Sequence, residues 1–331
     1  MTAPRVLVVV NPESGGGALR RRWPDLERQI REFVGARDLN IAFTHELDHG
    51  AGFVRSALRD GAKRVIAVGG DGTLSDLVQG FFHQGSPVAP DAELALVPGG
   101  RGNDFFRMIQ PRRSLLEGGS PVDRGLELLK KGTGTPTDLI HCRMLSRDGG
   151  MTTRYCVNLA SFGFGGHVVT RLSRRVGVLG KSFFSKGSLA YVLHSLATFL
   201  EYKKVHVRVR VDDKDFYEGP LMMGALLNGA YNAGGLCWSK QARIDDGLLD
   251  VVLVPPLSPQ AMPLIGKALI GGDLVSVPGV LSAQGKKVEV VDLDPALHRY
   301  KLFEVDGDLP EPPGLVRAEF EVLAAAIRIR R

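Results

Sequence analysis

The sequence predicts an α/β plus β fold, with an N-terminal doubly wound, mostly parallel α/β domain at residues 1–134 and a C-terminal, mostly antiparallel, β-sandwich-like domain at residues 135–331. Up to residue 131, short apolar runs alternate with amphipathic helical patterns, which is typical of a parallel sheet covered by helices on both faces. Beyond residue 135, strand-like runs dominate, and one of them alternates apolar and polar side chains as a strand with one solvated face does. The length of 331 residues and the hydrophobic content of 44% suit two globular domains of ordinary size.

In the N-terminal half, predicted strands alternate with predicted helices. Arg5–Val10 is an apolar strand, and the turn after it leads into a helix. The apolar residues of this helix recur at spacings of three and four, namely Leu19, Trp23, Leu26, Ile30 and Phe33. The further predicted strands are Leu39–Thr44, Val65–Val68 and Glu93–Val97, and the further helices are Ala51–Arg59, a segment starting at Leu74, and Pro121–Lys131. The strand C-termini of such a sheet gather their loops into one crevice.

In the C-terminal half, strands are predicted to outnumber helices. Val205, Val207, Val209 and Val211 alternate with polar residues, so this strand has one wet face. The predicted strands are Leu139–Leu145, Arg154–Leu159, Lys204–Val211, Pro220–Asn228, Leu248–Val254, Lys287–Leu293 and Lys301–Val305. The helices lie mainly near Leu189–Leu200 and Pro259–Ile270.

The composition limits the classes of function. The net charge of +6 is compatible with binding to nucleotides or to anionic lipid surfaces, and equally with a solvated exterior. No run of eighteen apolar residues occurs, and the best candidate, Leu264–Leu281, contains Lys267 and Asp273, so no transmembrane helix is predicted. The N-terminus is interpreted as a first strand rather than a secretory signal. The three widely spaced cysteines suggest a reducing compartment, and we expect a cytoplasmic protein.

The stretch Arg64–Leu74, RVIAVGGDGTL, carries the clearest chemical signal. An apolar strand stops at a glycine-rich turn that opens a helix. This order places backbone N–H groups at a helix N-terminus, where they suit a phosphate group. Asp71 adds a carboxylate that could sit beside a metal ion. The alternative interpretation is a tight turn between strand and helix with no ligand.

Small residues and carboxylates recur at other strand ends. One cluster follows the first strand, at Asn11–Gly17, and another follows the strand that ends at Val97, at Gly99–Asp104. Two Asp-Gly clusters lie in the C-terminal half, at 245–247 and 306–308. Each is weak alone, because Asp-Gly is common in turns. A Walker A pattern is absent, and no GxGxxG follows a strand.

Taken together, these clusters resemble a known family. The order NPESGGG, VGGDGTLSD, PGGRGNDFFR, NLASFGFGG, DDGLLDVV and VDGD is similar to that of the bacterial diacylglycerol kinase-like lipid kinases. These kinases share a nucleotide-binding domain with sphingosine kinases and, more distantly, with NAD kinases and phosphofructokinases. The resemblance runs from Asn11 to Asp308. The segment Gly102–Phe105 and the Asp245–Gly247 cluster point to the lipid kinase branch.

The resemblance implies roles for individual residues. It implies an ATP site formed by Asn11, Pro12, Glu13, Ser14, Gly15, Thr44, Gly69, Gly70, Asp71, Gly72, Thr73, Leu74, Ser75, Arg101, Asn103 and Asp104. It implies that Mg²⁺ is held by Asp246, with backbone carbonyls near Arg243 and Leu248, and that Asp308 is the catalytic base. The alternative is that Asp308 only caps a turn and that Asp306 or Asp104 accepts the proton. The family usually has threonine where this chain has Arg101, and glutamate where it has Asp308.

The resemblance therefore predicts an ATP- and Mg²⁺-dependent lipid kinase that phosphorylates a hydroxyl of diacylglycerol or a related lipid. Its partner would be a lipid at a membrane surface, with transient membrane association, no nucleic acid and no transmembrane segment; a homo-oligomer is left open. The basic and apolar stretch Arg171–Lys186 is a candidate membrane contact, and a solvated loop is the alternative. The alternatives for function are an NAD kinase-like enzyme and a catalytically silent lipid- or nucleotide-binding protein.

Overall fold

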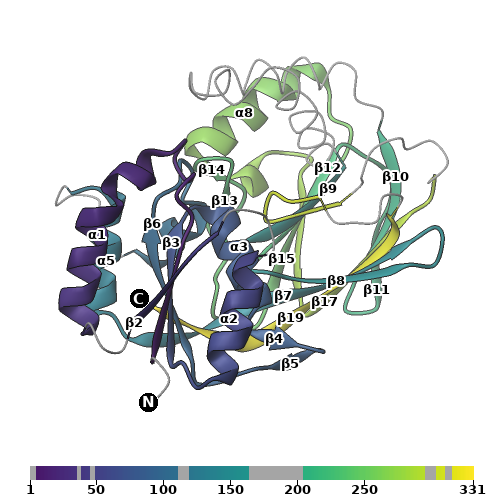
Figure 1. The fold of residues 1–331 in the computed structure, drawn as a ribbon. Coiled ribbons are helices and arrows are strands. Elements are labelled where there is room, and N and C mark those ends of the chain that lie inside the picture. Colours follow the sequence, from purple (N-terminus) through teal and green to yellow (C-terminus); the bar gives the residue numbers. More distant parts are fainter. Residues whose placement is uncertain are drawn as a thin grey trace.

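The N-terminal half of the molecule is built on four parallel strands. The computed structural model describes residues 5–35, 39–44, 49–110, 119–163, 204–294, 303–309 and 315–331. The four strands lie in the order β2-β1-β3-β6, with bounds Val6–Val10 for β1, Leu39–Phe43 for β2, Arg64–Gly69 for β3 and Glu93–Pro98 for β6 (Figure 1). All their pairings are parallel and in unbroken register. The order changes direction between β1 and β3, which is where loops diverge to leave a crevice.

Helices cover both faces of this sheet, as the doubly wound prediction requires. Val8 of β1 faces the cluster that holds α1 and α5, and Val9 faces the cluster that holds α2 and α3. Successive strand side chains point to opposite faces, so a continuous apolar strand serves both layers. The helices are α1 (Ala18–Val34), α2 (His49–Arg59), α3 (Asp71–Gln79), α4 (Asp104–Ile109) and α5 (Pro121–Lys131), and a small hairpin is formed by β4 (Phe82–His83) and β5 (Ser86–Pro87).

The sheet continues into the C-terminal half through its last strand. β19 (Leu315–Arg330) pairs in parallel with the start of β6 at Arg328↔Glu93 and antiparallel with two other strands. A ten-stranded sheet results, in the order β11-β10-β17-β19-β6-β3-β1-β2, with β7 paired to β19 and β8 to β7. The added strands are β7 (Gly134–Ser146), β8 (Met151–Cys156), β10 (Val205–Val211), β11 (Lys214–Leu221) and β17 (Lys287–Asp292). The domain boundary after residue 134 stays a prediction.

A second, five-stranded sheet completes the sandwich. Its order is β16-β15-β12-β9-β18, and every pairing in it is antiparallel. The bounds are β9 (Leu159–Gly163), β12 (Met223–Leu227), β15 (Leu249–Val254), β16 (Leu281–Gly285) and β18 (Phe303–Val305). Phe162 and Phe303 of this sheet pack in one buried cluster with Val290 and Phe320 of the large sheet. The mostly antiparallel, sandwich-like prediction for this half is confirmed.

The outer face of the five-stranded sheet carries the remaining elements. They are a hairpin of β13 (Tyr231–Asn232) and β14 (Leu236–Cys237), a 3₁₀ turn η4 (Pro259–Ala261), the helix α8 (Met262–Gly271) and a second 3₁₀ turn η5 (Leu274–Ser276). Ile265 and Ala268 of α8 are buried in one cluster with Trp238 and Leu274. The described part of the chain contains no helix long and apolar enough to cross a membrane.

Several predicted elements differ from the structure. The predicted strand Arg154–Leu159 is two strands, β8 and β9, in different sheets, because the backbone between them turns to donate three N–H groups to Asp306. The predicted strand Pro220–Asn228 spans the end of β11 and the whole of β12. No strand was predicted beyond Val305, and the longest strand, β19, lies there. The helix predicted at Leu189–Leu200 and the stretch Arg171–Lys186 lie outside the described residues.

Candidate active site

Three glycine-rich loops are in backbone contact at the carboxyl ends of β1, β3 and β6. The N–H of Gly99 donates to the carbonyl of Gly69 at 2.7 Å. A Cβ atom placed on Gly100 would lie 2.6 Å from the Cα of Gly70, and one placed on Gly15 would lie 2.8 Å from the carbonyl oxygen of Gly99. Side chains cannot fit at these approaches, so glycine is what allows the three loops to form one surface.

The loop after β1 is tied to the loop after β3. The Asn11 side chain donates from Nδ2 to Thr73 Oγ1 at 3.1 Å, and its Oδ1 accepts the N–H of Glu13 at 3.1 Å. Pro12 and Gly15 are partly exposed, Ser14 is buried, and Glu13 forms an exposed ion pair with Arg20. Gly15 and the two glycines after it have φ of 65°, 75° and 83°, a left-handed turn that delivers the chain into α1.

The loop after β3 opens directly into α3. Gly70 is the N-cap, and no side chain caps the helix. The backbone N–H groups of its first turn are therefore available to donate hydrogen bonds to a ligand. Gly72 borders open space, since a Cβ atom there would meet nothing within 4 Å. Leu74 is buried, and Ser75 is 0% exposed, so both side chains lie behind the loop surface. The donors available at this loop are therefore backbone amides.

The loop after β6 folds on itself through Asn103. Its Oδ1 accepts the N–H of Gly100 at 3.0 Å and its Nδ2 donates to the Gly100 carbonyl at 2.9 Å. Asp71 Oδ1 accepts the N–H of Phe105 at 3.2 Å, which fixes α3 to α4. Arg101 is exposed and reaches toward the loop after β1, where a Cβ atom on Gly16 would lie 2.7 Å from Arg101 Nη2.

Asp104, the first residue of α4, is a buried acid beside this surface. Its Oδ2 accepts the N–H of Gly234 at 2.8 Å, and its Oδ1 lies 3.5 Å from Arg107 Nε. Burial raises the pKa of Asp104, the nearby Asp71 carboxylate adds to that rise, and the Gly234 N–H opposes it. This carboxylate therefore ties the loop after β6 to the β13–β14 hairpin.

Thr44 and Asp76 support the loops from the side of β2 and α2. Thr44 follows β2, is buried, and donates both its N–H (2.9 Å) and its hydroxyl (3.5 Å) to the carbonyl of Val10, just before Asn11. The Asp76 carboxylate accepts the N–H groups of Gly50 (2.9 Å) and of the next residue (3.2 Å) at the start of α2. Asp76 had no predicted role, although it is the last residue of the VGGDGTLSD motif.

An acidic turn follows β18. Asp306 and Gly307 have φ of 49° and 87°, and the backbones of Val305 and Asp308 exchange two hydrogen bonds of 2.9 Å across them. The Asp306 carboxylate accepts three backbone N–H groups of residues 157–159, at 2.9, 2.9 and 3.2 Å. Asp308 differs, because its side chain is 34% exposed and its Oδ2 lies 3.9 Å from Arg154 Nη2.

The acidic turn and the glycine-rich loops share one intermediate segment, residues 229–237. Asn158 donates from Nδ2 to the carbonyl of Tyr231 at 2.8 Å, beside the backbone that holds Asp306. In the turn between β13 and β14, the N–H of Gly234 donates to Asp104. Gln79 of α3 adds a second link, since it exchanges hydrogen bonds of 2.6 and 3.0 Å with the backbone of Tyr155 on β8.

The predicted metal residues lie in the loop before β15. Arg243 and Asp246 are exposed, and Asp246 Oδ1 accepts the N–H of Leu248 at 3.1 Å. Asp245 pairs with Arg331 at 2.6 Å, and this hydrogen bond lowers the pKa of Asp245. The described residues contain no cluster of three or more His, Cys, Asp or Glu side chains that could hold a metal ion.

Asp138 of β7 holds the same loop in place. Its two carboxylate oxygens accept the N–H groups of Gly247 and Ala325, each at 2.7 Å, and its own N–H donates to Ile244 at 2.7 Å. Ala325 has a φ of 52° in the bulge of β19. The loop before β15 is therefore anchored to β7 and β19.

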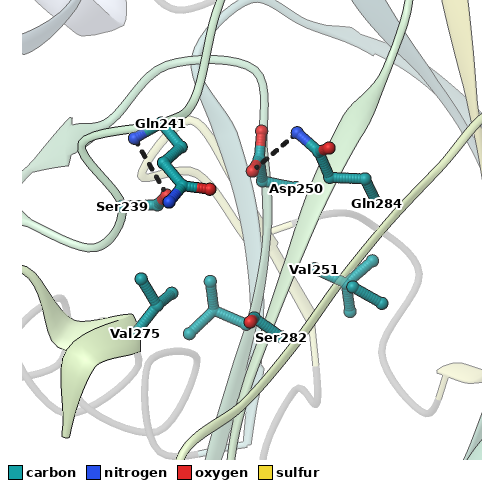
Figure 2. Close-up of a pocket in the computed structure, with 9 residues that line it drawn as sticks. Ser239, Gln241, Asp250, Val251, Val275, Ser282 and Gln284 are labelled. Carbon is teal, nitrogen blue, oxygen red and sulfur yellow. Dashed lines mark hydrogen bonds between the residues drawn. The ribbon is translucent and has the colours of Figure 1, made fainter.

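A polar pocket of about 250 Å³ lies on the five-stranded sheet next to this loop (Figure 2). Its polar lining consists of Ser239, Gln241, Asp250, Ser282 and Gln284. Asp250 is 6% exposed, and its Oδ1 accepts a hydrogen bond from Gln284 at 3.2 Å. Its Oδ2 has no hydrogen-bond partner in the described part of the chain, and burial raises the pKa of this carboxyl to about 6.

Comparison with known proteins identifies the family. The family model for the diacylglycerol kinase catalytic domain matches residues 5–142, and that for the YegS C-terminal NAD kinase beta sandwich-like domain matches residues 168–331. A Xanthomonas axonopodis pv. citri protein named "probable lipid kinase YegS-like" is 30% identical over 248 residues, which cover 73% of this chain and 74% of that protein. The chain belongs to the YegS-like lipid kinase family.

Other YegS-like relatives agree with this assignment. A protein of the same name from Xanthomonas oryzae pv. oryzae is 29% identical over 272 residues, 80% of this chain and 82% of that protein. The structure titled a diacylglycerol kinase from Bacillus anthracis str. Sterne superposes with a TM-score of 0.66 at 19% identity, and covers 99% of this chain and 96% of that one. This likeness shows a shared fold across both halves of the molecule.

For this YegS-like chain, the structure brings together most of the predicted ATP residues. The loops that carry Asn11, Gly70 and Asn103 touch one another, and Thr44 adjoins them through Val10. The other predicted site residues lie elsewhere. Asp308 is near Arg154 of β8, and the 243–248 loop is anchored to β7 and β19. The supporting carboxylates Asp76 and Asp138 had no predicted role, and Asp306 was expected only as an alternative base, because their partners are backbone amides far away in sequence.

Proposed function

We propose that this protein transfers the terminal phosphoryl group of ATP to a hydroxyl of diacylglycerol or a closely related lipid, with Mg²⁺ and at a membrane surface. The observation that carries the proposal is the single surface formed by three glycine-rich loops in front of the uncapped N-terminus of α3. Such a surface offers backbone N–H groups and a favourable helix dipole to the phosphates.

The acceptor side of the proposal rests on Asp308. Phosphoryl transfer to an alcohol is helped by a carboxylate that accepts the hydroxyl proton. Asp306 is poorly suited to this role, because its carboxylate accepts three backbone N–H groups and is tied to residues 157–159. The Asp308 side chain is partly exposed, and its backbone is held by the tight turn, so this carboxylate can meet a lipid hydroxyl.

The residues proposed for magnesium fit that ion chemically. Mg²⁺ takes one or two carboxylates and keeps several waters, and Asp246 is an exposed carboxylate in an anchored loop. Asp246 would hold the ion together with the carbonyls of Arg243 and Leu248. When bound, the ion would neutralise charge on the phosphates. Asp71 offers a further carboxylate beside the glycine-rich loops.

The test is transfer of labelled phosphate from ATP to diacylglycerol in mixed micelles, with the product identified by mass spectrometry. We expect Asp308→Asn to lower kcat by roughly 10²–10⁴, because general-base help has about that value, while the ATP dissociation constant changes little. Asp308→Glu should retain substantial activity, because it keeps the carboxylate. Asp306→Asn is the matched control, and we expect it to lower thermal stability, since it weakens the anchor of residues 157–159.

Three outcomes would contradict the proposal. An Asp308→Asn enzyme with normal kcat would remove Asp308 from the base role. Phosphorylation of NAD in place of the lipid would identify an NAD kinase-like enzyme. Binding of ATP or lipid with no phosphoryl transfer at all would identify a catalytically silent binding protein. Arg101, where the family usually has threonine, would then be a candidate reason for the lost activity.

A further inference from the structure

The outward face of α8 is unusually apolar for a surface helix. Ile265 and Ala268 point inward and are buried. On the opposite side, the side chains of Leu264 and Ile270 are 54% and 71% exposed. Exposed large aliphatic side chains gathered on one helix face mark an interaction surface more often than single scattered ones do.

The charge of this segment favours an anionic partner. Residues 251–272 contain no aspartate or glutamate, and their one charged residue is Lys267, which is exposed on α8 between Leu264 and Ile270. A lysine flanked by aliphatic side chains can place its stem among acyl chains and its ammonium group among lipid phosphates. A soluble acidic protein would pair with the ammonium group but would leave most of the aliphatic surface without a match.

The position of α8 relates this face to the candidate active site. α8 packs on β14, and the turn of the β13–β14 hairpin donates the Gly234 N–H to Asp104 at the start of α4. In Figure 1, α8 lies across the top of the molecule, at the end where β1 finishes and α1 begins. A bilayer in contact with α8 would therefore lie on the side of the molecule that carries the glycine-rich loops.

We propose that Leu264, Lys267 and Ile270 form the contact of this protein with the surface of an anionic bilayer. The inference rests on the proposed function in one respect, since that function supplies the reason to visit a membrane. The contact is reversible, because two partly inserted side chains and one lysine are far weaker than a spanning helix. α8 thus adds a described surface for membrane contact, separate from the stretch Arg171–Lys186.

The experiment is vesicle sedimentation with the full chain, on phosphatidylcholine vesicles with and without phosphatidylglycerol. We expect the double variant Leu264→Glu/Ile270→Glu to bind the mixed vesicles at least ten-fold more weakly than wild type. The control is Met151→Glu, which places one such charge at an apolar residue that is 63% exposed on β8. This control should bind the vesicles as wild type does.

Lys267 is tested by charge reversal. Lys267→Glu should weaken binding to phosphatidylglycerol vesicles by roughly 5- to 30-fold, because each basic residue near an anionic surface adds about 1 kcal/mol. Binding to pure phosphatidylcholine should change little. Lys63→Glu, which makes the same change just before β3 at the opposite end of the parallel strands, should leave both unchanged. The difference between wild type and Lys267→Glu in binding to phosphatidylglycerol vesicles should shrink as the salt concentration is raised.

Failure of this inference is distinguishable from failure of the proposed function. Vesicle binding that is equal in wild type and the Leu264/Ile270 variant overturns the inference, whatever the enzyme does. Loss of vesicle binding together with conversion of a dimer to a monomer on size exclusion also overturns it, since the face would then join two copies. Phosphoryl transfer to a dispersed short-chain diacylglycerol tests the proposed function alone, and the α8 variants should match wild type in that assay.

Discussion

The close approach of Gly100 to Gly70 leads to the sharpest prediction for the site. Ordinary contacts to a Cβ atom begin at 3.4 Å, and a Cβ on Gly100 would lie 2.6 Å from the Cα of Gly70. Gly100→Ala must therefore separate the loops after β3 and β6 by 3.4 − 2.6 = 0.8 Å. The neighbour is backbone, which has no side-chain rotation to relieve the clash.

Gly100→Ala is expected to change both the stability of the protein and its activity. Overpacking of this kind costs about 1–3 kcal/mol of the free energy of unfolding. Misplacement of catalytic or binding groups by about 1 Å can cost on the order of 10²-fold in rate. We expect Gly100→Ala to fold, to unfold at lower urea concentration, and to lose roughly 10²-fold in kcat/KM for ATP.

Two other glycines supply the comparison. Gly52 in α2 and Gly72 in α3 both border open space, so alanine fits at either position. Gly52→Ala should raise the free energy of unfolding by up to about 1 kcal/mol, through helix propensity, and leave activity unchanged. Gly72→Ala should fold as well as wild type but bind ATP more weakly, because its methyl group would occupy space at the proposed phosphate site. Steady-state kinetics, isothermal titration with ATP and urea unfolding measure the activity, the ATP affinity and the free energy of unfolding. An unchanged kcat/KM for ATP in Gly100→Ala would refute the reasoning.

Two further predictions concern carboxylates. Asp246→Asn should raise the magnesium concentration for half-maximal activity far more than Asp245→Asn, because Asp245 already pairs with Arg331; equal effects in a magnesium titration would remove Asp246 from the site. Asp250→Asn should raise the free energy of unfolding more at pH 7.5 than at pH 4.5, by about 2 kcal/mol. The pKa of Asp250 in the native protein, about 6, exceeds its ordinary value of 3.8, so the carboxyl makes the fold less stable as pH rises through that window. Urea unfolding of variant and wild type at both pH values checks it, and a pH-independent difference would contradict it.

The N-terminal half could be predicted almost completely from the sequence, and the reason is local. Each parallel strand is a short apolar run, and its helix follows within one loop, so hydrophobic periodicity alone separates them. The stretch Arg64–Leu74 is the clearest example, since β3, the glycine turn and the start of α3 lie within eleven residues. Its proximity to the Gly99–Asn103 loop could also be predicted, because the carboxyl ends of neighbouring parallel strands lie at one edge of the sheet.

β19 was missed because its pattern is interrupted. Its first part alternates about Phe320, but Ala324, Ala325 and Ala326 then break the alternation, and the β19–β7 ladder shifts register between Leu323 and Ile327. The strand extends across both halves because it pairs with β7 and β6, which are far away in sequence. Such pairing cannot be read from a window of ten residues.

The supporting carboxylates escaped prediction for a related reason. Asp138, Asp306 and Asp76 all accept backbone N–H groups, which every residue except proline carries, so no partner residue type marks them. The separation in sequence between these carboxylates and their amide partners ranges from 25 to 187 residues. Sequence reasoning finds acids in motifs and assigns them to ligands or catalysis. Here the burial and the amide donors of Asp306 indicate a structural role, although it shares a motif with Asp308.

This distinction bears on how the two halves of the site are held together. Asp104 contacts the β13–β14 hairpin at Gly234, and Asn158 contacts the same hairpin at Tyr231 while its own N–H is held by Asp306. The hairpin therefore has one contact with the loops proposed for ATP and another with the turn proposed for the acceptor. α8 packs on β14, so a membrane surface bound to α8 would be in contact with the helix that supports the same hairpin. The geometry between the two proposed sites thus depends on a hairpin with four strand residues, on the Gln79–Tyr155 link, and on partly buried hydrogen bonds that polar substitution can weaken without disturbing either core.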